Sequence, residues 1–154
     1  MPRWDDPVDA HHAAVSGQRW NPPGVACLYL NVDVLTARNN VVGRFAGLPY
    51  GPEDLEPTEA PVLIVVKVPE GLALDAFSDK GVTAVGPPTT YPLDSADNLV
   101  AHSVFQPIGT AAYQAGLDGV ASHSAAPGSS RELAWFPRSQ PASVTERVSF
   151  SAWW

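Results

Sequence analysis

Three polar side chains in the first third of the chain have the types needed to bind a phosphate-bearing ring compound. Arg19 lies in a segment rich in glycine and proline, Tyr29 follows ten residues later, and Asn40 follows eleven residues after that. A guanidinium binds a phosphate through two parallel hydrogen bonds, and a phenol stacks on a flat ring or donates a hydrogen bond to it. The spacing alone leaves open a second interpretation, in which Arg19 is a solvated or ion-paired surface residue and Tyr29 belongs to the core.

The elements that must position these residues follow from apolar periodicity and from helix-breaking residues. Residues 1–24 contain several prolines and are predicted to be loop, and the apolar run 26–30 predicts a short buried strand. Apolar residues recur near helical spacing over 34–47, where Asn31 or Asp33 can cap a helix by accepting its first free N–H groups. The first candidate is thus expected on a loop, the second on a strand and the third on a helix, an arrangement that can bring all three into one cleft.

The rest of the chain predicts short elements separated by proline-rich loops. Residues 62–68 (VLIVVKV) give the strongest strand signal, and their continuous β-branched run indicates a central strand buried on both faces. Weaker signals predict loops over 47–61 and 81–98, a helix over 108–115, and strands over 72–75, 119–122, 132–136 and 147–151. The expected fold is a small mixed α+β domain over residues 1–154, with a split β-sheet and short helices.

The composition argues against two classes of protein. Sixteen acidic residues against nine basic ones give a formal charge of −7, and no stretch clusters the Lys and Arg that binding to duplex nucleic acid requires. The longest apolar run, Val62 to Val66, is far shorter than the ~18 residues that span a bilayer, and no secretory signal opens the chain. The single cysteine, Cys27, cannot form an internal disulfide, which favours a reducing, cytoplasmic location. We therefore expect no direct contact with nucleic acid and no membrane insertion.

Two groups of residues carry a resemblance to a known family. The first is a Gly-x-Arg-Trp-Asn run, a turn and a strand that contains a Tyr, formed by Gly17, Arg19, Trp20, Asn21, Pro23, Gly24 and Tyr29. The second is Gly116-Leu117-Asp118-Gly119-Val120, then a Ser in SHSAA and Glu132-Leu133-Ala134-Trp135-Phe136. Together they resemble the RES-domain family, the toxins of bacterial toxin–antitoxin pairs. The functional Ser of that family is matched by Ser124, with Ser122 as the alternative.

The resemblance implies a fold like that of the ADP-ribosyltransferases and an activity that degrades NAD+. The nicotinamide–ribose bond would be cleaved and the ADP-ribosyl unit passed to water or phosphate, with NAD+ as substrate and no required cofactor. Arg19, with Trp20 and Asn21 beside it, would hold a phosphate or ribose oxygen. Tyr29 would pack on nicotinamide, and Ser124 would form a hydrogen bond with the ribose or the amide. The resemblance also implies a helix-turn-helix (Xre-type) antitoxin that covers the cleft.

The chain departs from the family at Asn40, where members usually carry Glu. A carboxylate can accept a hydrogen bond from the ribose 2′-hydroxyl and also stabilise a cationic ribose by its charge, whereas an amide can only form the hydrogen bond. Three interpretations follow: a slow enzyme, an enzyme in which Glu132 or Asp118 supplies the carboxylate, or an inactive domain that binds NAD-like ligands. ADP-ribosylation of a macromolecule is a further alternative.

Two histidine-containing motifs favour structural roles. The adjacent His11 and His12 point in opposite directions and have no partners at metal-ligand spacing, so no metal site is expected. In Ser122-His123-Ser124 the neighbouring side chains diverge, which argues against a nucleophilic Ser activated by the adjacent His.

The burial of Cys27, Trp153 and Trp154 is predicted from their apolar character. Cys27 lies in an apolar strand and is expected to be a buried small hydrophobe with an inert thiol. Trp153 and Trp154 are expected to pack on the domain or to cover a partner or subunit interface, which leaves a homo-oligomer open.

Overall fold

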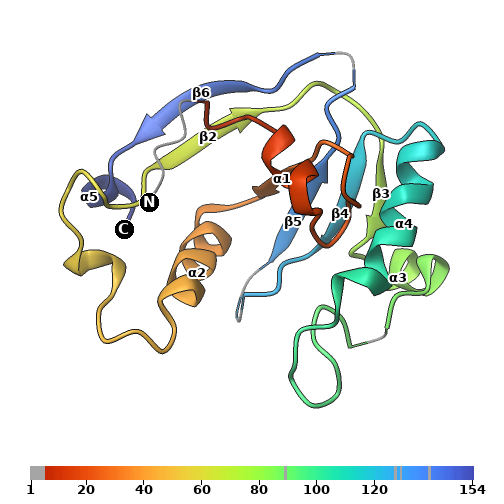
Figure 1. The fold of residues 1–154 in the computed structure, drawn as a ribbon, viewed down its shortest axis with the longest axis horizontal. Helices are drawn as coiled ribbons and strands as arrows, with labels where there is room; N and C mark the ends of the chain where they lie inside the picture. The colour runs from red at the N-terminus through yellow and green to blue at the C-terminus, as the bar shows by residue number, and fades with distance from the viewer. Residues whose placement is uncertain (1–5, 89, 127, 129, 139) are drawn as a thin grey trace.

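Two separate β-sheets, flanked by short helices, organise the chain (Figure 1). A computed structural model describes residues 6–88, 90–126, 128, 130–138 and 140–154. The elements in chain order are α1 (His11–Ser16), β1 (Leu28–Asn31), α2 (Val34–Phe45), the short 3-10 helix η1 (Pro52–Asp54), β2 (Leu63–Lys67), β3 (Ala73–Ala76), α3 (Asp79–Val85), α4 (His102–Gln114), β4 (Gly119–His123), β5 (Arg131–Trp135), β6 (Ser143–Val148) and α5 (Phe150–Trp153). The predicted fold class, a small α+β fold with split sheets and short helices, is confirmed.

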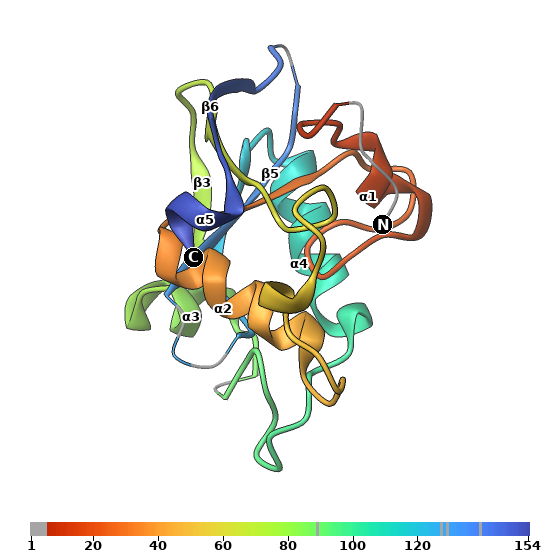
Figure 2. The same cartoon turned by 90° about the vertical axis from the view of Figure 1, so that its left-hand side faces the viewer.

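The larger sheet has the strand order β1-β5-β4-β3. The pairs β1–β5 and β5–β4 are antiparallel, and β3 lies parallel to β4 at the edge. The connection from β3 to β4 contains α3 and α4, as a parallel pair requires. The smaller sheet pairs β2 with β6 and runs along one side of the molecule as a ribbon (Figures 1 and 2).

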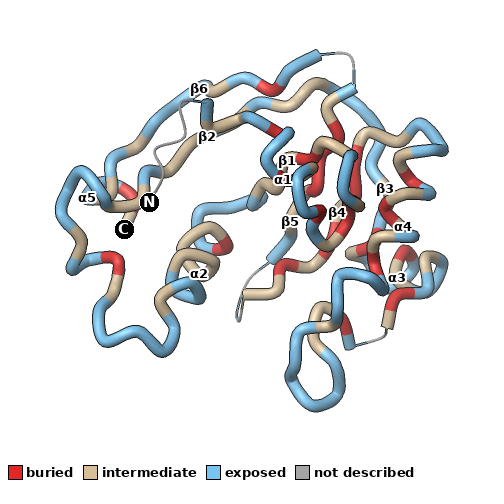
Figure 3. The backbone as a smooth tube through the Cα atoms, viewed as in Figure 1, coloured by how far each residue is buried: buried red, intermediate tan, exposed pale blue. Residues whose placement is uncertain are grey.

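The core lies against the larger sheet. Buried segments gather around β4, β5, α1 and α4, whereas the β2–β6 ribbon is half-buried or exposed (Figure 3). Trp20 and Phe105 are both fully buried, and their ring centroids lie 5.1 Å apart in an edge-to-face arrangement. Gly109 of α4 comes so close to the Trp20 backbone that a Cβ there would lie 1.7 Å from the Trp20 carbonyl oxygen. The segment containing Trp20 is therefore wedged between the sheet and α4.

The helix that carries Asn40 forms as the sequence predicts. Asp33 is its N-cap, and its carboxylate accepts a hydrogen bond of 2.7 Å from the backbone N–H of Thr36. Thr36 is buried, and its hydroxyl accepts from the Ser130 backbone N–H at 3.0 Å. The helix is thus tied to the segment between β4 and β5, next to the larger sheet.

The prediction that residues 62–68 form a central strand buried on both faces is wrong. They form β2, whose strand partner is β6, and none of its residues is buried. Val65 remains 39% exposed. A continuous β-branched run predicts a strand but does not say how many neighbours that strand has, and the central positions of the larger sheet belong to β4 and β5.

Helix boundaries also differ from the prediction in three places. Residues 11–16, predicted as loop, form α1, because the carbonyls of Ala10, Ala13 and Ala14 accept hydrogen bonds from residues 21–27. Residues 79–85 form α3, capped by the Ser78 hydroxyl, where a loop was expected from residue 81. Beyond β6, residues 150–153 form α5 and not the end of a strand.

Helix α4 starts six residues before the predicted boundary and includes Pro107 in its interior. Proline often marks the first turn of a helix, which is why the prediction started there. The turn before it is helical because Phe105 enters the core against Trp20 and Tyr91. Tertiary packing therefore outweighs the backbone hydrogen bond that proline removes.

The apolar residues with special chemistry are packed as expected. Cys27 is 2% exposed, and burial raises the pKa of its thiol to about 12. Trp153 is buried and donates its indole N–H to the Pro61 carbonyl at 3.1 Å. Trp154 stacks on Phe150 and lies under the Arg38 guanidinium, which also donates to the carbonyls of Trp153 and Trp154. Within the described ranges, every helix is too short or too polar to cross a membrane.

Candidate functional site

The turn that contains Arg19 is held by a tyrosine and an asparagine. The Tyr29 hydroxyl accepts a hydrogen bond of 2.8 Å from the Trp20 backbone N–H and donates one of 2.9 Å to Asn21 Oδ1. Asn21 Nδ2 in turn donates to the carbonyls of Ala13 at 3.0 Å and Val25 at 2.8 Å. Strand β1 therefore fixes the turn through Tyr29, and the spacing of ten residues between Arg19 and Tyr29 reflects this direct contact.

Trp20 and Asn21 support the turn from beneath. Both side chains have no exposed surface, and the Trp20 indole N–H donates to the Ser122 hydroxyl at 3.0 Å. The expectation that these two residues contact NAD+ does not fit their burial. They anchor the turn to β1 and β4 and so determine where Arg19 lies.

Arg19 reaches over the end of β4. Its Nη1 donates to the His123 carbonyl at 3.1 Å and lies 3.9 Å from Glu132 Oε1. Both side chains are mostly enclosed, with 12% and 14% of their surface exposed. No other acceptor for the guanidinium occurs among the described residues, so its remaining N–H groups are free to bind an anionic ligand.

One face of the larger sheet carries the polar residues around Arg19. Side chains alternate along a strand, so strand register decides which residues share a face. The pairs Asn31↔Glu132↔Ser122 and Tyr29↔Ala134↔Val120 place these side chains on the same face. Glu132 thus lies in the middle strand of three, between β1 and β4.

The electrostatics of this face follow from its burial. Desolvation raises the pKa of Glu132, and the nearby Arg19 guanidinium reduces that shift without cancelling it. Desolvation also raises the pKa of Tyr29, so its hydroxyl stays protonated. This hydroxyl already donates to Asn21 and accepts from Trp20, and the ring packs against the core.

Asn40 and Ser124 meet at the edge of this face. Asn40 Nδ2 lies 3.2 Å from Ser124 Oγ and 2.7 Å from Asn31 Oδ1, to which it donates. The α2 helix positions Asn40, and its amide also contacts the Thr36 carbonyl at 3.2 Å. The structure therefore brings Asn40 and Ser124 into contact, and Arg19 to the carbonyl of His123, the residue before Ser124. Tyr29 lies two residues before Asn31 on β1 and contacts the turn of Arg19 through its hydroxyl.

The structure distinguishes the two candidate serines, Ser122 and Ser124, and the two candidate acids, Glu132 and Asp118, by their positions. Ser122 is fully buried, and its hydroxyl accepts a hydrogen bond from the Trp20 indole N–H. Ser124 lines a cavity of about 530 Å³. Asp118 precedes β4, at the opposite end of the strand from Ser122, and its carboxylate accepts from the Leu72 backbone N–H at 2.9 Å. Of the two acids considered as substitutes for the missing Glu, Glu132 lies beside Arg19 and Asp118 does not.

An aromatic group that sequence reasoning missed borders the site. The His123 ring packs on Phe77, with centroids 4.4 Å apart, and against Tyr91 at 5.6 Å. The Tyr91 hydroxyl accepts from the His123 backbone N–H at 3.3 Å. These residues come from segments far apart in the sequence, and neither Tyr91 nor Phe77 lies in a recognisable motif. No local sequence signal could have identified them.

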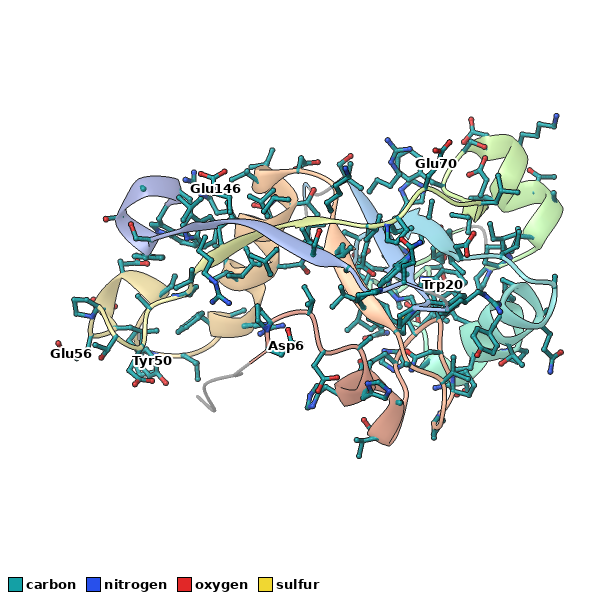
Figure 4. All side chains as sticks on the ribbon, turned by 90° about the horizontal axis from the view of Figure 1, so that it is seen from above. Asp6, Trp20, Tyr50, Glu56, Glu70 and Glu146 are labelled. Carbon is teal, nitrogen blue, oxygen red and sulfur yellow. The ribbon has the colours of Figure 1, made fainter. Side chains whose placement is uncertain are left out.

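A larger cavity lies elsewhere. Its volume is about 850 Å³, and Phe45, Leu48, Tyr50 and Trp154 contribute to its walls. Tyr50 lies at the opposite end of the molecule from Trp20 (Figure 4). The cavity next to Ser124 is smaller; its walls come from the loop over residues 90–97 and from Ser124, Ala125 and Ala126, and Arg19, Glu132 and Asn40 do not line it. We assign the candidate site to the sheet face because the contacts of Arg19 with Glu132 and of Asn40 with Ser124 lie there.

The site is composed for an anionic, sugar-containing ligand. It offers cationic donors from Arg19, a carboxylate from Glu132, an aromatic ring from Tyr29 and neutral donors from Asn40 and Ser124. In the part of the chain that the structure describes, His, Cys, Asp and Glu form no group of three that could hold a metal ion. The side chains named here can offer hydrogen bonds and charge to a ligand.

Comparison with known proteins adds to this geometry. The family model of the RES domain matches residues 2–154. Among curated proteins, none matches the sequence. The crystal structure of the M. tuberculosis MbcT–MbcA toxin–antitoxin complex contains a similar chain, with a TM-score of 0.73, 22% sequence identity, and coverage of 97% of this chain and 80% of that chain. This likeness shows a shared fold. Since the family model covers nearly every residue, the protein belongs to the RES-domain family, as its motifs predict.

Proposed function

We propose that the protein is the toxin of a toxin–antitoxin pair and that it breaks down NAD+ in the cytoplasm. The nicotinamide–ribose bond is cleaved, and the ADP-ribosyl unit passes to water or to phosphate. Membership of the RES-domain family supports the proposal, as does the similarity in fold to a protein solved as part of a toxin–antitoxin complex. The observation that carries it is the pairing of a partly free guanidinium, Arg19, with a desolvated carboxylate, Glu132, on one sheet face.

The proposed reaction uses these residues in simple roles. The C1′–N bond breaks with its electron pair remaining on nicotinamide, which leaves as a neutral molecule, and the ribose becomes an oxocarbenium ion. Water then adds its oxygen to C1′ and loses one proton to solvent, or phosphate adds through one oxygen. Arg19 binds the diphosphate, the Tyr29 ring packs against nicotinamide, and Ser124 forms a hydrogen bond with the ribose. The reaction needs neither a redox step nor a cofactor.

Nicotinamide release is the direct test. Purified protein is incubated with NAD+, with and without phosphate, and nicotinamide and ADP-ribose products are separated and quantified. Arg19→Ala is expected to abolish release, because the diphosphate loses its charged partner. Arg44→Ala is the matched control, since Arg44 is an exposed residue at the end of α2. No nicotinamide from the wild type at micromolar protein, or equal rates for both variants, contradicts the proposal.

The antitoxin is the expected protein partner. We propose a helix-turn-helix (Xre-type) protein that covers the cleft. Co-expression with the neighbouring gene product should relieve growth arrest by the wild-type chain, and the purified pair should release less nicotinamide than the chain alone. Growth arrest that persists despite a stable complex would contradict inhibition by coverage.

Asn40 supports a second candidate function. The amide at this position carries no negative charge, and it is already hydrogen-bonded to Asn31 and Ser124. In this alternative the chain binds NAD+ without cleaving it. Calorimetric binding of NAD+ together with no nicotinamide release over hours favours this function, and measurable turnover excludes it.

A further inference from the structure

We propose that Glu132 is the catalytic carboxylate of this site, facing the ribose carbon from which nicotinamide departs. This inference rests on the proposed function and names the group that stabilises its transition state. The developing oxocarbenium ion carries positive charge, and glycosidic bond cleavage in general uses a carboxylate near that charge. Glu132 lies on β5, where register places it between Asn31 and Ser122, and 3.9 Å from the Arg19 guanidinium.

The immediate surroundings of Glu132 are those of a ligand-facing group. Asn31, its neighbour across the β1–β5 pair, accepts a hydrogen bond of 2.7 Å from Asn40, and Asn40 also contacts Ser124. The carboxylate thus lies beside the Arg19 guanidinium and across from Asn31, which is in turn bonded to Asn40. A ligand whose phosphates contact Arg19 is therefore within reach of the Glu132 carboxylate.

Glu132 also differs from the structural carboxylates of the same chain. Asp75 accepts from two backbone N–H groups and the Ser78 hydroxyl, and Asp94 accepts from the backbone N–H groups of Ala96 and Asn98. These bonds lower the pKa of both aspartates. Across the described residues, the Glu132 carboxylate has no hydrogen bond, and its contact with Arg19 is longer than a hydrogen bond.

This arrangement is unfavourable for stability. A mostly buried carboxylate that lacks hydrogen bonds is costly, and an ion pair repays desolvation only when its geometry is good. A group of this kind is frequent at functional sites, where the missing partner is the ligand. The cationic ribose supplies that partner in the transition state and not before, which is the condition for lowering the barrier.

The other acidic groups near the sheet are placed differently. Asp118 lies before β4, at its far end, and Asp75 alternates onto the opposite face. Within the residues described, Glu132 is the acid at ion-pair distance from Arg19. A carboxylate at the position of Asn40 is therefore not required, because Glu132 on β5 supplies the negative charge from the middle of the sheet.

The first test compares Glu132→Gln with the control Glu146→Gln, a change on the exposed β6 far from Trp20 (Figure 4). Loss of a single preorganised group predicts a fall in kcat of ~10²–10³-fold, with NAD+ affinity changed less than about threefold because Arg19 still binds the diphosphate. Glu146→Gln should match the wild type. Equal kcat for Glu132→Gln and wild type overturns the inference, whereas absence of turnover in the wild type overturns the proposed function itself.

The second test relocates the charge. The double variant Glu132→Gln/Asn40→Glu returns a carboxylate to the same cleft from the helix side, and we expect it to recover at least tenfold in kcat over Glu132→Gln. In the wild-type background, Asn40→Glu adds a second like charge and should not raise kcat substantially. A large gain from Asn40→Glu alone, with no loss from Glu132→Gln, shows that Glu132 is not the catalytic carboxylate.

The third test separates catalysis from a merely structural ion pair. The groups that act electrostatically on Glu132 are Arg19 from the turn, Cys27 and Tyr29 from β1, and Tyr91 from the loop before α4. The raised pKa means that the ionised form, which the reaction needs, is lost at a higher pH than for an ordinary Glu. The wild type should show an acid limb in kcat, and Glu132→Gln should lack it.

Stability gives the matching readout. A raised pKa in the folded state makes the protonated form favourable, so this contribution to stability is present at low pH and is lost as the pH rises through the pKa. At neutral pH the charged Glu132 therefore destabilises the fold, and Glu132→Gln should keep or raise the urea midpoint. A lowered midpoint together with weakened NAD+ binding indicates a structural ion pair and overturns the inference.

Discussion

The hydroxyl of Tyr29 joins the turn that carries Arg19 to strand β1, and its removal should cost stability before it affects chemistry. In Tyr29→Phe the ring stays, but the Trp20 backbone N–H and Asn21 Oδ1 lose the partner that lies 2.8 Å and 2.9 Å from them. Both residues are fully buried, so water cannot replace the hydroxyl without rearrangement.

The expected size follows from these two orphaned groups. An unsatisfied buried polar group costs roughly 1–3 kcal/mol, so two of them at about 1.5 kcal/mol each lower the free energy of unfolding by about 3 kcal/mol. With a urea dependence of about 2 kcal/mol per molar for a domain of this size, the midpoint falls by about 1.5 M.

Urea unfolding followed by tryptophan fluorescence measures this shift. Tyr113→Phe is the matched control, since Tyr113 is a partly buried tyrosine whose hydroxyl has no hydrogen bond to any described residue. Its midpoint should stay within about 0.3 M of the wild type. If Tyr29→Phe also keeps the wild-type midpoint while NAD+ binding weakens, the hydroxyl serves the ligand and our account of the turn is refuted.

Two further predictions concern the packing behind the site. Gly109→Ala forces a Cβ against the Trp20 carbonyl and should lower the free energy of unfolding by at least ~3 kcal/mol. Gly43→Ala, on the exposed part of α2, should raise it by roughly 0.5–1 kcal/mol. Circular dichroism melts measure both, and a Gly109→Ala variant as stable as Gly43→Ala would contradict the close packing of α4 on Trp20. Cys27, whose pKa burial raises to about 12, should not react with a thiol reagent at pH 8 until urea unfolds the chain. Rapid labelling of the native protein would contradict its burial.

Local sequence signals predicted the elements that depend on neighbours in the chain. The Asp33 cap and the apolar spacing after it were enough for α2, and the short apolar strand before it was enough for β1. The turn at Arg19 and the strand at Tyr29 were placed correctly because both lie within one continuous motif. The family itself followed from that motif, and the RES-domain match confirms it.

Features that depend on distant contacts could not be predicted. The short α1 helix is held by hydrogen bonds from residues 21–27, and the first turn of α4 by packing of Phe105 on Trp20. The apolar run of β2 indicates a strand, but nothing local says how many neighbours that strand has. Likewise, Glu132 became the leading carboxylate only when register placed it opposite Asn31 and beside Arg19.

Helix α2 links two parts of the protein that share no strand. Arg38 donates to the carbonyls of Trp153 and Trp154 at the end of α5, while Asn40 contacts Ser124 and Asn31 at the larger sheet. Residues two apart on a helix project roughly 200° from one another, so Arg38 and Asn40 contact structures on opposite sides of α2. The C-terminal helix and the polar residues at the sheet edge are thus attached to the same helix, although they belong to opposite parts of the chain.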